Sequence, residues 1–293
     1  MVTEEMVKKA TGKDFLEFAA DGLGVAGSQS FRKILTFLDD KKYLSELNGN
    51  EKVEAIFVRS EDVSLVRPGI KVLEVDDPKW YFFTLLNYLA ITKERSRSII
   101  SETSEIHPSA VISNTGVIIE EGVIIEPNAT VLQDVIIKAG AVIRAGAVLG
   151  VDGYEHKRTS KGILSVAHDG MVIIGKNVEI GVNCNIAKGF SYRDTIVGDE
   201  TKIDALVHYA HGAQCGYRCM IVASAMVAGH VTIGDDVWVG PNSTISNRIT
   251  IGSGAFVTLG SVVVQDVPAG GKVTGNFAIP HMKFIRNLKE SIN

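Results

Sequence analysis

Hydrophobic residues recur at every sixth position over much of this chain. From residue 197 to residue 263, twelve consecutive positions of that register hold an aliphatic or comparably buried type. They are Val197, Ile203, Tyr209, Cys215, Ile221, Val227, Ile233, Val239, Ile245, Ile251, Val257 and Val263. The next residue is often glycine or alanine, which suits a tight turn. A six-residue period predicts a solenoid in which each unit is a short strand followed by a turn.

The same register predicts a parallel β-helix with three faces. Three units make a triangular coil, and the strands of successive coils lie about 4.8 Å apart. An earlier run of the register holds Ile119, Ile125, Val131, Ile137, Ile143 and Leu149. Residues 150–170 and a five-residue excess around the sequence FSYRD interrupt the pattern. Since insertions of this kind do not fit inside a stack, we expect them to project as loops, where ligand contacts are common.

The first hundred residues lack the six-residue period and predict a small α/β domain. Residues 29–47 carry apolar side chains at helical spacing, and residues 53–58 and 71–75 are typical of short buried strands. Asp77 and Pro78 are suited to cap and open a helix that is apolar nearly all round. Such a helix is expected to pack on several sides.

We therefore expect a mainly β chain with three parts. Residues 1–103 form an N-terminal α/β domain, and residues 104–278 form the β-helix with the projecting loop 150–170. Residues 279–293 form a short amphipathic helix after Pro280.

Composition and charge exclude several classes of function. Hydrophobic residues make up 45% of the chain, charged residues 22%, and the net charge of -4 does not favour nucleic acid binding. The three cysteines, Cys184, Cys215 and Cys219, have no spacing typical of a disulfide framework. Neither a signal peptide nor a transmembrane segment is apparent, so we expect a cytoplasmic protein.

Two histidine motifs predict an active site on the β-helix. Residues eighteen positions apart lie on neighbouring coils, so His211 should lie beside Gly229, with His230 next to it. A histidine can take a proton from an attacking amine near neutral pH, and a glycine N–H can donate to the oxyanion of acyl transfer. We predict these roles for His211 and Gly229, with His208 binding substrate or orienting His211.

Two other interpretations of these histidines are open. They could be surface residues, or they could lie in contacts between subunits. A metal site formed by His208, His211 and His230 is disfavoured, because no acidic or cysteine ligand stands at a usual zinc spacing. We therefore predict no metal.

Several motifs resemble the UDP-3-O-acylglucosamine N-acyltransferases of lipid A and lipopolysaccharide synthesis. The matching stretches include IHPSAVIS, GVDGY, DTIVGDETKID, LVHYAHGAQCG and VAGHVTIG, and the likeness spans about residues 25–265. The resemblance implies a left-handed β-helix, His211 as the general base and Gly229 as the oxyanion donor. It also implies a homotrimer with active sites between subunits, in which His211 faces a neighbour.

The resemblance also suggests where substrate binds. The N-terminal region is similar to the family's uridine-binding domain and implies that Phe37 and Tyr43 contact the nucleotide base. The alternative is that both rings pack in the core of the small domain. Tyr154 and His168 in the interrupted segment, together with His230, are further candidates for substrate contact.

Three departures limit the comparison. The separation of His211 and His230 is about one coil shorter than in the family. Ala187 and Lys188 stand where the family carries an acid and an arginine. The C-terminal segment, including DDVWVGPNSTISNRITIG, resembles hexapeptide acetyltransferases that modify nucleotide-linked amino sugars.

The sequence thus predicts an enzyme that transfers an acyl group to the amine of a nucleotide-linked amino sugar. The donor would be a thioester of acyl-carrier protein or coenzyme A, acting as a co-substrate, and no cofactor is expected to be bound. One alternative is a short-chain acyl- or acetyl-CoA-dependent enzyme acting on another UDP- or dTDP-amino sugar. Another is a β-helix scaffold without catalysis.

Overall fold

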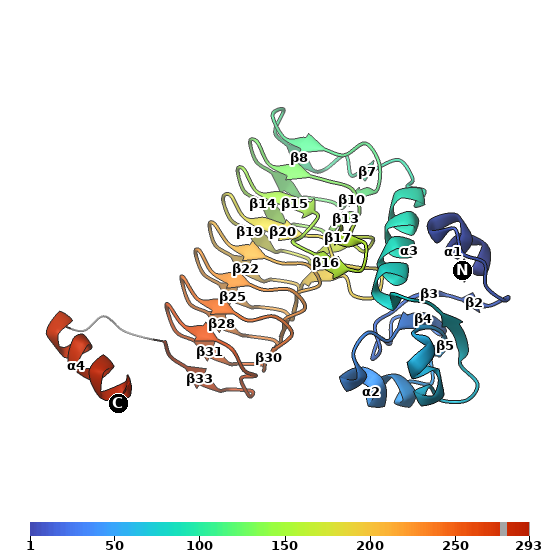
Figure 1. Cartoon of the computed structure of the whole chain (residues 1–293). Coiled ribbons are helices and arrows are strands. Elements are labelled where there is room, and N and C mark those ends of the chain that lie inside the picture. Colours follow the sequence, from blue (N-terminus) through green and yellow to red (C-terminus); the bar gives the residue numbers. More distant parts are fainter. Residues whose placement is uncertain (276–279, 293) are drawn as a thin grey trace.

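Three long parallel sheets form the faces of a β-helix that extends through most of the molecule (Figure 1). The computed structural model describes residues 1–275 and 280–292. Neighbouring strands of a sheet come from successive coils. The predicted fold class, a mainly β chain with a parallel β-helix, a small α/β domain and a short C-terminal helix, is confirmed.

Each face of the β-helix is one sheet of short strands. The first contains β7 (Ile99–Ile100), β10 (Val117–Ile119), β13 (Val135–Ile137), β18 (Val172–Ile174), β21 (Thr195–Val197), β24 (Gln214–Cys215), β27 (Thr232–Ile233) and β30 (Thr250–Ile251). The second contains β8 (Glu105–Ile106), β11 (Ile124–Ile125), β14 (Val142–Ile143), β19 (Glu179–Ile180), β22 (Lys202–Ile203), β25 (Met220–Ile221), β28 (Trp238–Val239), β31 (Phe256–Val257) and β33 (Lys272–Val273). The third contains β9 (Val111–Ile112), β12 (Thr130–Val131), β15 (Val148–Val151), β20 (Asn185–Ala187), β23 (His208–Tyr209), β26 (Met226–Val227), β29 (Thr244–Ile245) and β32 (Val262–Val263).

The six-residue register forms the core of the coil, as predicted. All twelve positions from Val197 to Val263 are buried. Val197 pairs with Cys215, which confirms a coil of eighteen residues. Tyr209 fits this core because its hydroxyl donates to the Ile196 carbonyl at 2.9 Å. The register begins earlier than expected, because β7 already pairs with β10.

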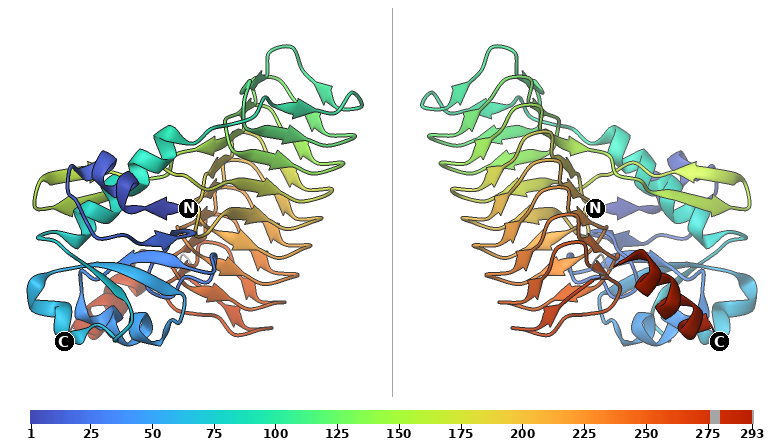
Figure 2. Two further views of the ribbon diagram at one scale, coloured as in Figure 1. Left: turned by 90° about the vertical axis from the view of Figure 1, so that its right-hand side faces the viewer. Right: turned by 90° about the vertical axis from the view of Figure 1, so that its left-hand side faces the viewer.

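Residues 150–170 leave the stack and form an antiparallel hairpin, β16 (His156–Thr159) and β17 (Gly162–Ser165). The hairpin packs against helix α3 (Pro78–Thr92) of the N-terminal domain (Figures 1 and 2). The Asn87 side-chain amide donates to the Ser165 carbonyl at 2.8 Å, and Lys161 Nζ lies 3.3 Å from the Trp80 ring centroid. The insertion therefore joins the domain to the coil.

The N-terminal domain has a four-stranded parallel sheet at its centre. Its sheet strands are β3 (Gly22–Leu23), β4 (Ile34–Phe37), β5 (Val53–Val58) and β6 (Lys71–Glu74). The other elements before α3 are β1 (Val2–Thr3), α1 (Glu4–Thr11), β2 (Ala19–Ala20), η1 (Lys41–Tyr43), α2 (Leu44–Gly49) and η2 (Ser60–Leu65). The predicted cap of α3 is confirmed, because the Asp77 carboxylate accepts from the Trp80 N–H at 3.0 Å.

One prediction for this domain was wrong. Residues 29–47 do not form one helix, because Ile34–Phe37 is strand β4 between β3 and β5. A short apolar run is compatible with both the helical and the strand period. Here hydrogen bonding to a strand on each edge stabilises the strand. Only the segment after Lys41 is helical.

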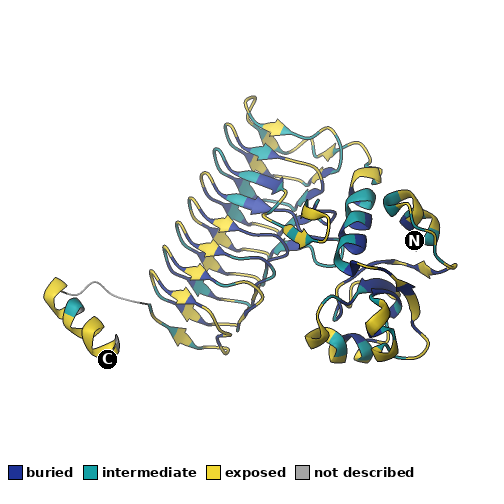
Figure 3. Ribbon diagram, in the orientation of Figure 1, coloured by how far each residue is buried: buried dark blue, intermediate teal, exposed yellow. Residues whose placement is uncertain are grey.

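The C-terminal segment forms helix α4 (His281–Ile292), and most of its described side chains are exposed (Figure 3). Residues 276–279, the end of the predicted coil range and the start of the predicted helix range, lie outside the described residues. Among the helices that the structure describes, none is long and apolar enough to cross a membrane.

A buried ion-pair cluster ties the linker after α3 to the coil. Arg95 donates hydrogen bonds to both oxygens of the Asp134 carboxylate, and Lys93 Nζ lies 3.0 Å from Asp134 Oδ1. Asp134 is buried in a left-handed turn with φ of 63°. Burial acts to raise the pKa of the Asp134 carboxyl. Hydrogen bonds from Arg95 and Lys93 together outweigh this effect, so the pKa lies below its ordinary value. This cluster helps to fix the N-terminal domain relative to the coil.

We expect Asp134→Asn to lower the free energy of unfolding by about 3 kcal/mol, because it leaves two cations without their buried partner. Asparagine tolerates the left-handed turn, so backbone strain does not contribute. Urea unfolding at pH 7 measures the effect. Asp236→Asn, which breaks a fully exposed pair with Arg218, is the matched control and should change stability little. Equal effects of the two substitutions would contradict the role of the cluster.

Candidate active site

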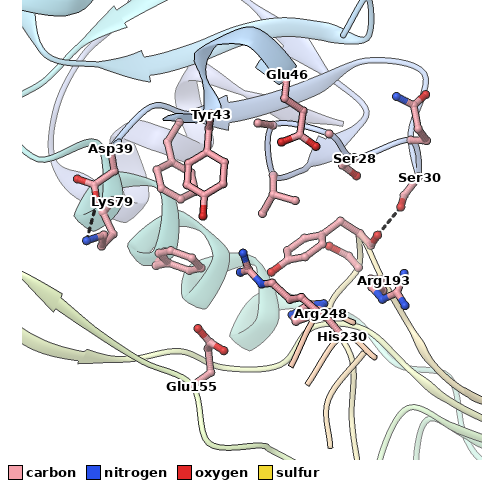
Figure 4. A pocket seen from close by; sticks show the side chains of 18 of the residues that line it. Ser28, Ser30, Asp39, Tyr43, Glu46, Lys79, Glu155, Arg193, His230 and Arg248 are labelled. Carbon is pink, nitrogen blue, oxygen red and sulfur yellow. Dashed lines mark hydrogen bonds and ion pairs between the residues drawn. The ribbon is translucent and has the colours of Figure 1, made fainter. Parts of the chain in front are cut away.

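A cleft of about 1200 Å³ lies between the N-terminal domain and the β-helix (Figure 4). The domain contributes residues 25–30 and the segment from Asp39 to Glu46. The coil contributes residues 191–194 and Arg248, and the insertion contributes Glu155. The N-terminal domain, the coil and the insertion thus line one cavity.

His211 lies just behind the wall of this cleft. It follows strand β23, and its side chain is almost enclosed, with 8% of the residue exposed. Its ring occupies a slot between Gly153 and Gly229. A Cβ atom at either glycine would lie 2.5 Å from a ring nitrogen, so any other residue there would displace the imidazole. The predicted neighbourhood of His211 and Gly229 is present in the structure.

Glu155 is the polar partner of His211. Its Oε2 lies 3.2 Å from His211 Nε2, and its other oxygen is paired with Lys157. Burial raises the pKa of Glu155, but hydrogen bonds from His211 and Lys157 lower it to about 2. Glu155 therefore carries a negative charge beside the imidazole throughout the neutral range. Since Glu155 lines the cleft, the pair presents a carboxylate with a histidine directly behind it.

His230 occupies a corner of the next coil, beside His211. The two ring centroids are 5.3 Å apart. The backbone N–H of His230 donates to the backbone carbonyl of His211 at 2.9 Å. The His230 ring lies parallel to those of Phe190 and Tyr192. Burial, with the nearby charges of His211 and Arg248, lowers the pKa of His230 to about 3. His230 thus lines the cleft as a neutral ring.

His168 supports the site from behind and does not line the cleft. It is 1% exposed and stacks on Phe190 with ring centroids 4.4 Å apart. Its Nε2 accepts a hydrogen bond from the Gly153 N–H at 3.2 Å. Burial lowers the pKa of His168 to about 4, so the ring is neutral at pH 7. The structure places it where it fixes Gly153 next to His211.

The Gly229 N–H donates to no carbonyl in the part of the chain that the structure describes. Gly229 lies in the turn after strand β26, and its Cα faces the His211 ring. A donor without a protein partner beside a histidine is the arrangement that an oxyanion requires.

Phe37 and Tyr43 both reach the cleft from the N-terminal domain. Tyr43 is 37% exposed, with Lys42 Nζ 4.9 Å from its ring centroid. Phe37 packs on Phe82, with ring centroids 4.6 Å apart, so it also belongs to the core of the domain. Phe37 thus lines the cavity and also packs in the domain core, whereas Tyr43 forms part of the cavity wall.

Two candidate residues lie away from the cleft. His208 is exposed on the outer surface of strand β23 and does not line the cavity. Tyr154 is 88% exposed and packs edge-on against His156, with ring centroids 4.7 Å apart. Alternation along a strand explains the first case, because Tyr209 points inward and its neighbour must point out.

Two arginines of the cleft were not found from the sequence. Arg193 donates to the Gly212 carbonyl at 2.7 Å and to Thr232 Oγ1 at 2.8 Å. Arg248 stands eighteen residues after His230 at the same left-handed corner. Among the described residues, neither guanidinium has a carboxylate within ion-pair distance. The spacing from Gly212 through His230 to Arg248 was the signal that could have identified Arg248.

The structure brings together no group of three metal-ligating side chains within residues 1–275 and 280–292. Cys184, Cys215 and Cys219 are free and buried.

Comparisons with known proteins show that parts of the chain are similar to acyltransferases. The family model for the bacterial transferase hexapeptide, six repeats, matches residues 116–150. UDP-3-O-acylglucosamine N-acyltransferase of Methylobacterium sp. (strain 4-46) is 39% identical over 140 residues, which are 48% of this chain and 40% of the relative. The enzyme of the same name from Rhizobium meliloti (strain 1021) is 36% identical over 143 residues, which are 48% of this chain and 40% of that protein. The chain thus spans about two fifths of the length of these relatives.

Solved structures were also compared. UDP-N-acetylglucosamine acyltransferase from Campylobacter jejuni is 29% identical, with a TM-score of 0.47 over 62% of this chain and 77% of that one. The Arabidopsis UDP-N-acetylglucosamine acyltransferase is 24% identical, with a TM-score of 0.48 over 65% and 77% of the two chains. The resemblance to UDP-3-O-acylglucosamine N-acyltransferases that the motifs predicted is confirmed by the sequence relatives.

The buried histidines predict a loss of stability in acid. His168 has a pKa of about 4 in the folded chain and 6.5 ordinarily, so the unfolded state binds its proton first as the pH falls. The stability that the neutral ring provides is complete above pH 6.5 and declines toward pH 4. We expect the free energy of unfolding to fall by about 1–2 kcal/mol between pH 7 and pH 5 on account of this residue.

Urea unfolding of wild type and His168→Gln at the two pH values measures the difference. The variant should lose less stability in acid than wild type. His281→Gln, on the exposed surface of α4, is the control and should behave as wild type. An unchanged pH dependence in His168→Gln would rule out this assignment.

Proposed function

We propose that this protein transfers an acyl group from a thioester to the amine of a nucleotide-linked amino sugar. The observation that carries the proposal is the pair of Glu155 and His211, which closes one end of a cleft whose opposite wall bears Tyr43. Sequence relatives named UDP-3-O-acylglucosamine N-acyltransferase support the reaction class. The donor is a thioester of coenzyme A or acyl-carrier protein, bound as a substrate.

The catalytic steps follow from the two polar groups at that end. Glu155 lines the cleft with His211 behind it, so we place the sugar amine at this end of the cleft, next to the Glu155–His211 pair. The amine nitrogen attacks the thioester carbon while His211 takes a proton from that nitrogen. Glu155 stabilises the imidazolium ion that results. The Gly229 N–H donates to the oxyanion of the tetrahedral intermediate. When the C–S bond breaks, the imidazolium returns its proton to the thiolate.

The rest of the cleft suits the nucleotide. Arg193 and Arg248 line the cleft, and no carboxylate of residues 1–275 and 280–292 lies within ion-pair distance of either, which favours binding of the diphosphate. Tyr43 offers an aromatic face to the base, and stacking of this kind contributes about 1–3 kcal/mol. The neutral ring of His230 lines the same cleft beside His211, where it can contact the sugar.

We further propose a homotrimer. The outer surfaces of the coil expose aliphatic side chains such as Leu206, Met226 and Val262, and closed cyclic symmetry is usual for homo-oligomers. His208 is exposed on the same outer surface as Met226 and would face a neighbouring subunit. Sedimentation equilibrium should give three times the mass of the 31.5 kDa chain, and a monomer would exclude the arrangement.

We expect His211→Ala to lower kcat for acyl transfer by about 10²- to 10⁴-fold, because it removes the general base. Mass spectrometry of products from UDP- and dTDP-amino sugars, combined with acetyl-CoA and 3-hydroxyacyl donors, provides the assay. Thermal unfolding checks that the variant is folded. His107→Ala, at an exposed position of the first coils, is the matched control and should keep full activity.

Glu155→Gln tests the partner of the base. It should lower kcat by about tenfold or more and change the pH profile of kcat, since the imidazolium loses its counter-charge. Unchanged transfer in His211→Ala would refute the mechanism. Absence of transfer by wild type with every donor and acceptor would favour a scaffold.

A further inference from the structure

Lys157 stands beside the candidate base and has no part in the catalytic steps. It lies on strand β16 of the projecting hairpin and lines the cleft. Its Nζ is paired with Glu155 Oε1, whereas Glu155 Oε2 lies 3.2 Å from His211 Nε2. One carboxylate is therefore shared between an ammonium group and an imidazole.

The backbone of the hairpin fixes where this carboxylate and this ammonium group lie. The Glu155 N–H donates to the Gly153 carbonyl at 3.1 Å, and the Glu155 carbonyl accepts from the Val166 N–H at 2.9 Å. Strand β16 then pairs with β17, with Lys157 opposite Leu164. Side chains two residues apart along an extended segment point to the same side, so Glu155 and Lys157 face the coil together.

A contact with the N-terminal domain holds the Lys157 side chain in place. Its Nζ lies 4.7 Å from the ring centroid of Phe83 on helix α3, and Phe83 is 3% exposed. An aromatic face attracts a cation at this distance. The side chains of Lys157 and Glu155 are 23% and 18% exposed, so solvent screens their charges only in part.

No second lysine or arginine shares Glu155 in the part of the chain that the structure describes. Lys79 also lines the cleft, but Figure 4 shows it paired with Asp39, at 2.6 Å. Among the described residues, Lys157 and His211 are the two ion-pair partners of Glu155. The charge of this carboxylate is therefore divided between them.

The other ionisable rings around His211 carry no charge at pH 7. Burial lowers the pKa of His168, His208 and His230, with a further contribution from the charge of His211. Burial raises the pKa of the Tyr192 phenol. These rings therefore do not take the place of Lys157.

The other charged groups near the site are engaged elsewhere or lie farther from the carboxylate. Asp152 is paired with Lys188 at 3.3 Å. Arg193 and Arg248 line the cleft, and neither lies within ion-pair distance of Glu155. Lys157 is thus the cation whose removal changes the charge next to Glu155.

We propose that Lys157 is a positioning residue that acts on His211 through Glu155. A carboxylate beside an imidazole favours the protonated ring, because opposite charges attract. A ring that already holds a proton cannot take one from the attacking amine. By binding one oxygen of Glu155 and offsetting part of its charge, Lys157 keeps His211 available as a base at neutral pH. The proposal rests on the proposed function and adds a residue to its mechanism.

The direction of a titration shift tests this role. Lys157→Met leaves Glu155 to His211 alone, so we expect the pH at which His211 gains its proton to rise by about 0.5–1 unit. Glu155→Gln leaves the positive charge of Lys157 without its counter-charge and should move that pH down. Histidine-ring NMR of the full-length protein measures both shifts, and the signal missing from His211→Ala identifies the ring.

The pH profile of acyl transfer provides a second measure. In Lys157→Met, the acid limb of kcat/KM should move to higher pH, which lowers transfer by about three- to tenfold on that limb and leaves it near wild type in alkali. Lys157→Arg keeps the charge and should restore the wild-type profile. Lys161→Met removes another lysine that the hairpin places over an aromatic ring of α3, and as the matched control it should leave the profile unmoved.

The two proposals fail in different ways. An unmoved His211 titration in Lys157→Met, or a shift to lower pH, would overturn the role of Lys157 and leave the proposed function standing. A higher KM with an unmoved pH profile would also overturn it, because Lys157 would then bind substrate directly. If wild type modifies no acyl acceptor, the proposed function is wrong, and the NMR titration still decides whether Lys157 acts on this imidazole.

Discussion

The site depends on the inward packing of one side chain in every six residues. This packing fixes coils of eighteen residues, and parallel pairing then decides which residues meet on neighbouring coils. His211 reaches Gly229 for this reason, and Arg248 stands directly after His230 along the stack. A shift of the register by one residue would turn buried side chains outward and separate these groups. The core of the coil therefore also sets the geometry of the candidate chemistry.

The stack alone does not make the cleft. Two insertions interrupt it at points close to His211: the hairpin of residues 150–170 supplies Glu155, and the loop around Tyr192 supplies an aromatic wall. The hairpin also packs on α3, which brings the N-terminal domain over the same end of the site. The interruptions of the repeat thus supply a carboxylate and aromatic rings to a cleft whose histidine and Arg248 come from the regular coils.

Charge within the cleft is divided by position. Glu155 lies beside His211 at the reacting end, and Arg193 and Arg248 lie along the coil. Glu46 stands apart on the N-terminal domain. Burial keeps His230 and His168 neutral, and His211 is the imidazole of this group that faces a carboxylate. Under the proposed function, this division would give the nucleotide sugar one orientation, with its base at the aromatic wall and its amine near Glu155.

The six-residue period by itself determined the coil, its buried positions and the meeting of His211 with Gly229, because these follow from a regular repeat. It also located the insertion, but not what the insertion does. The partner role of Glu155, the supporting place of His168 and the exposure of Tyr154 depend on how an irregular hairpin folds back. Strand β4 likewise became a strand because β3 and β5 pair with it, although its apolar spacing also fits a helix. Contacts between segments distant in sequence have no periodic signal, so only the tertiary structure decided them.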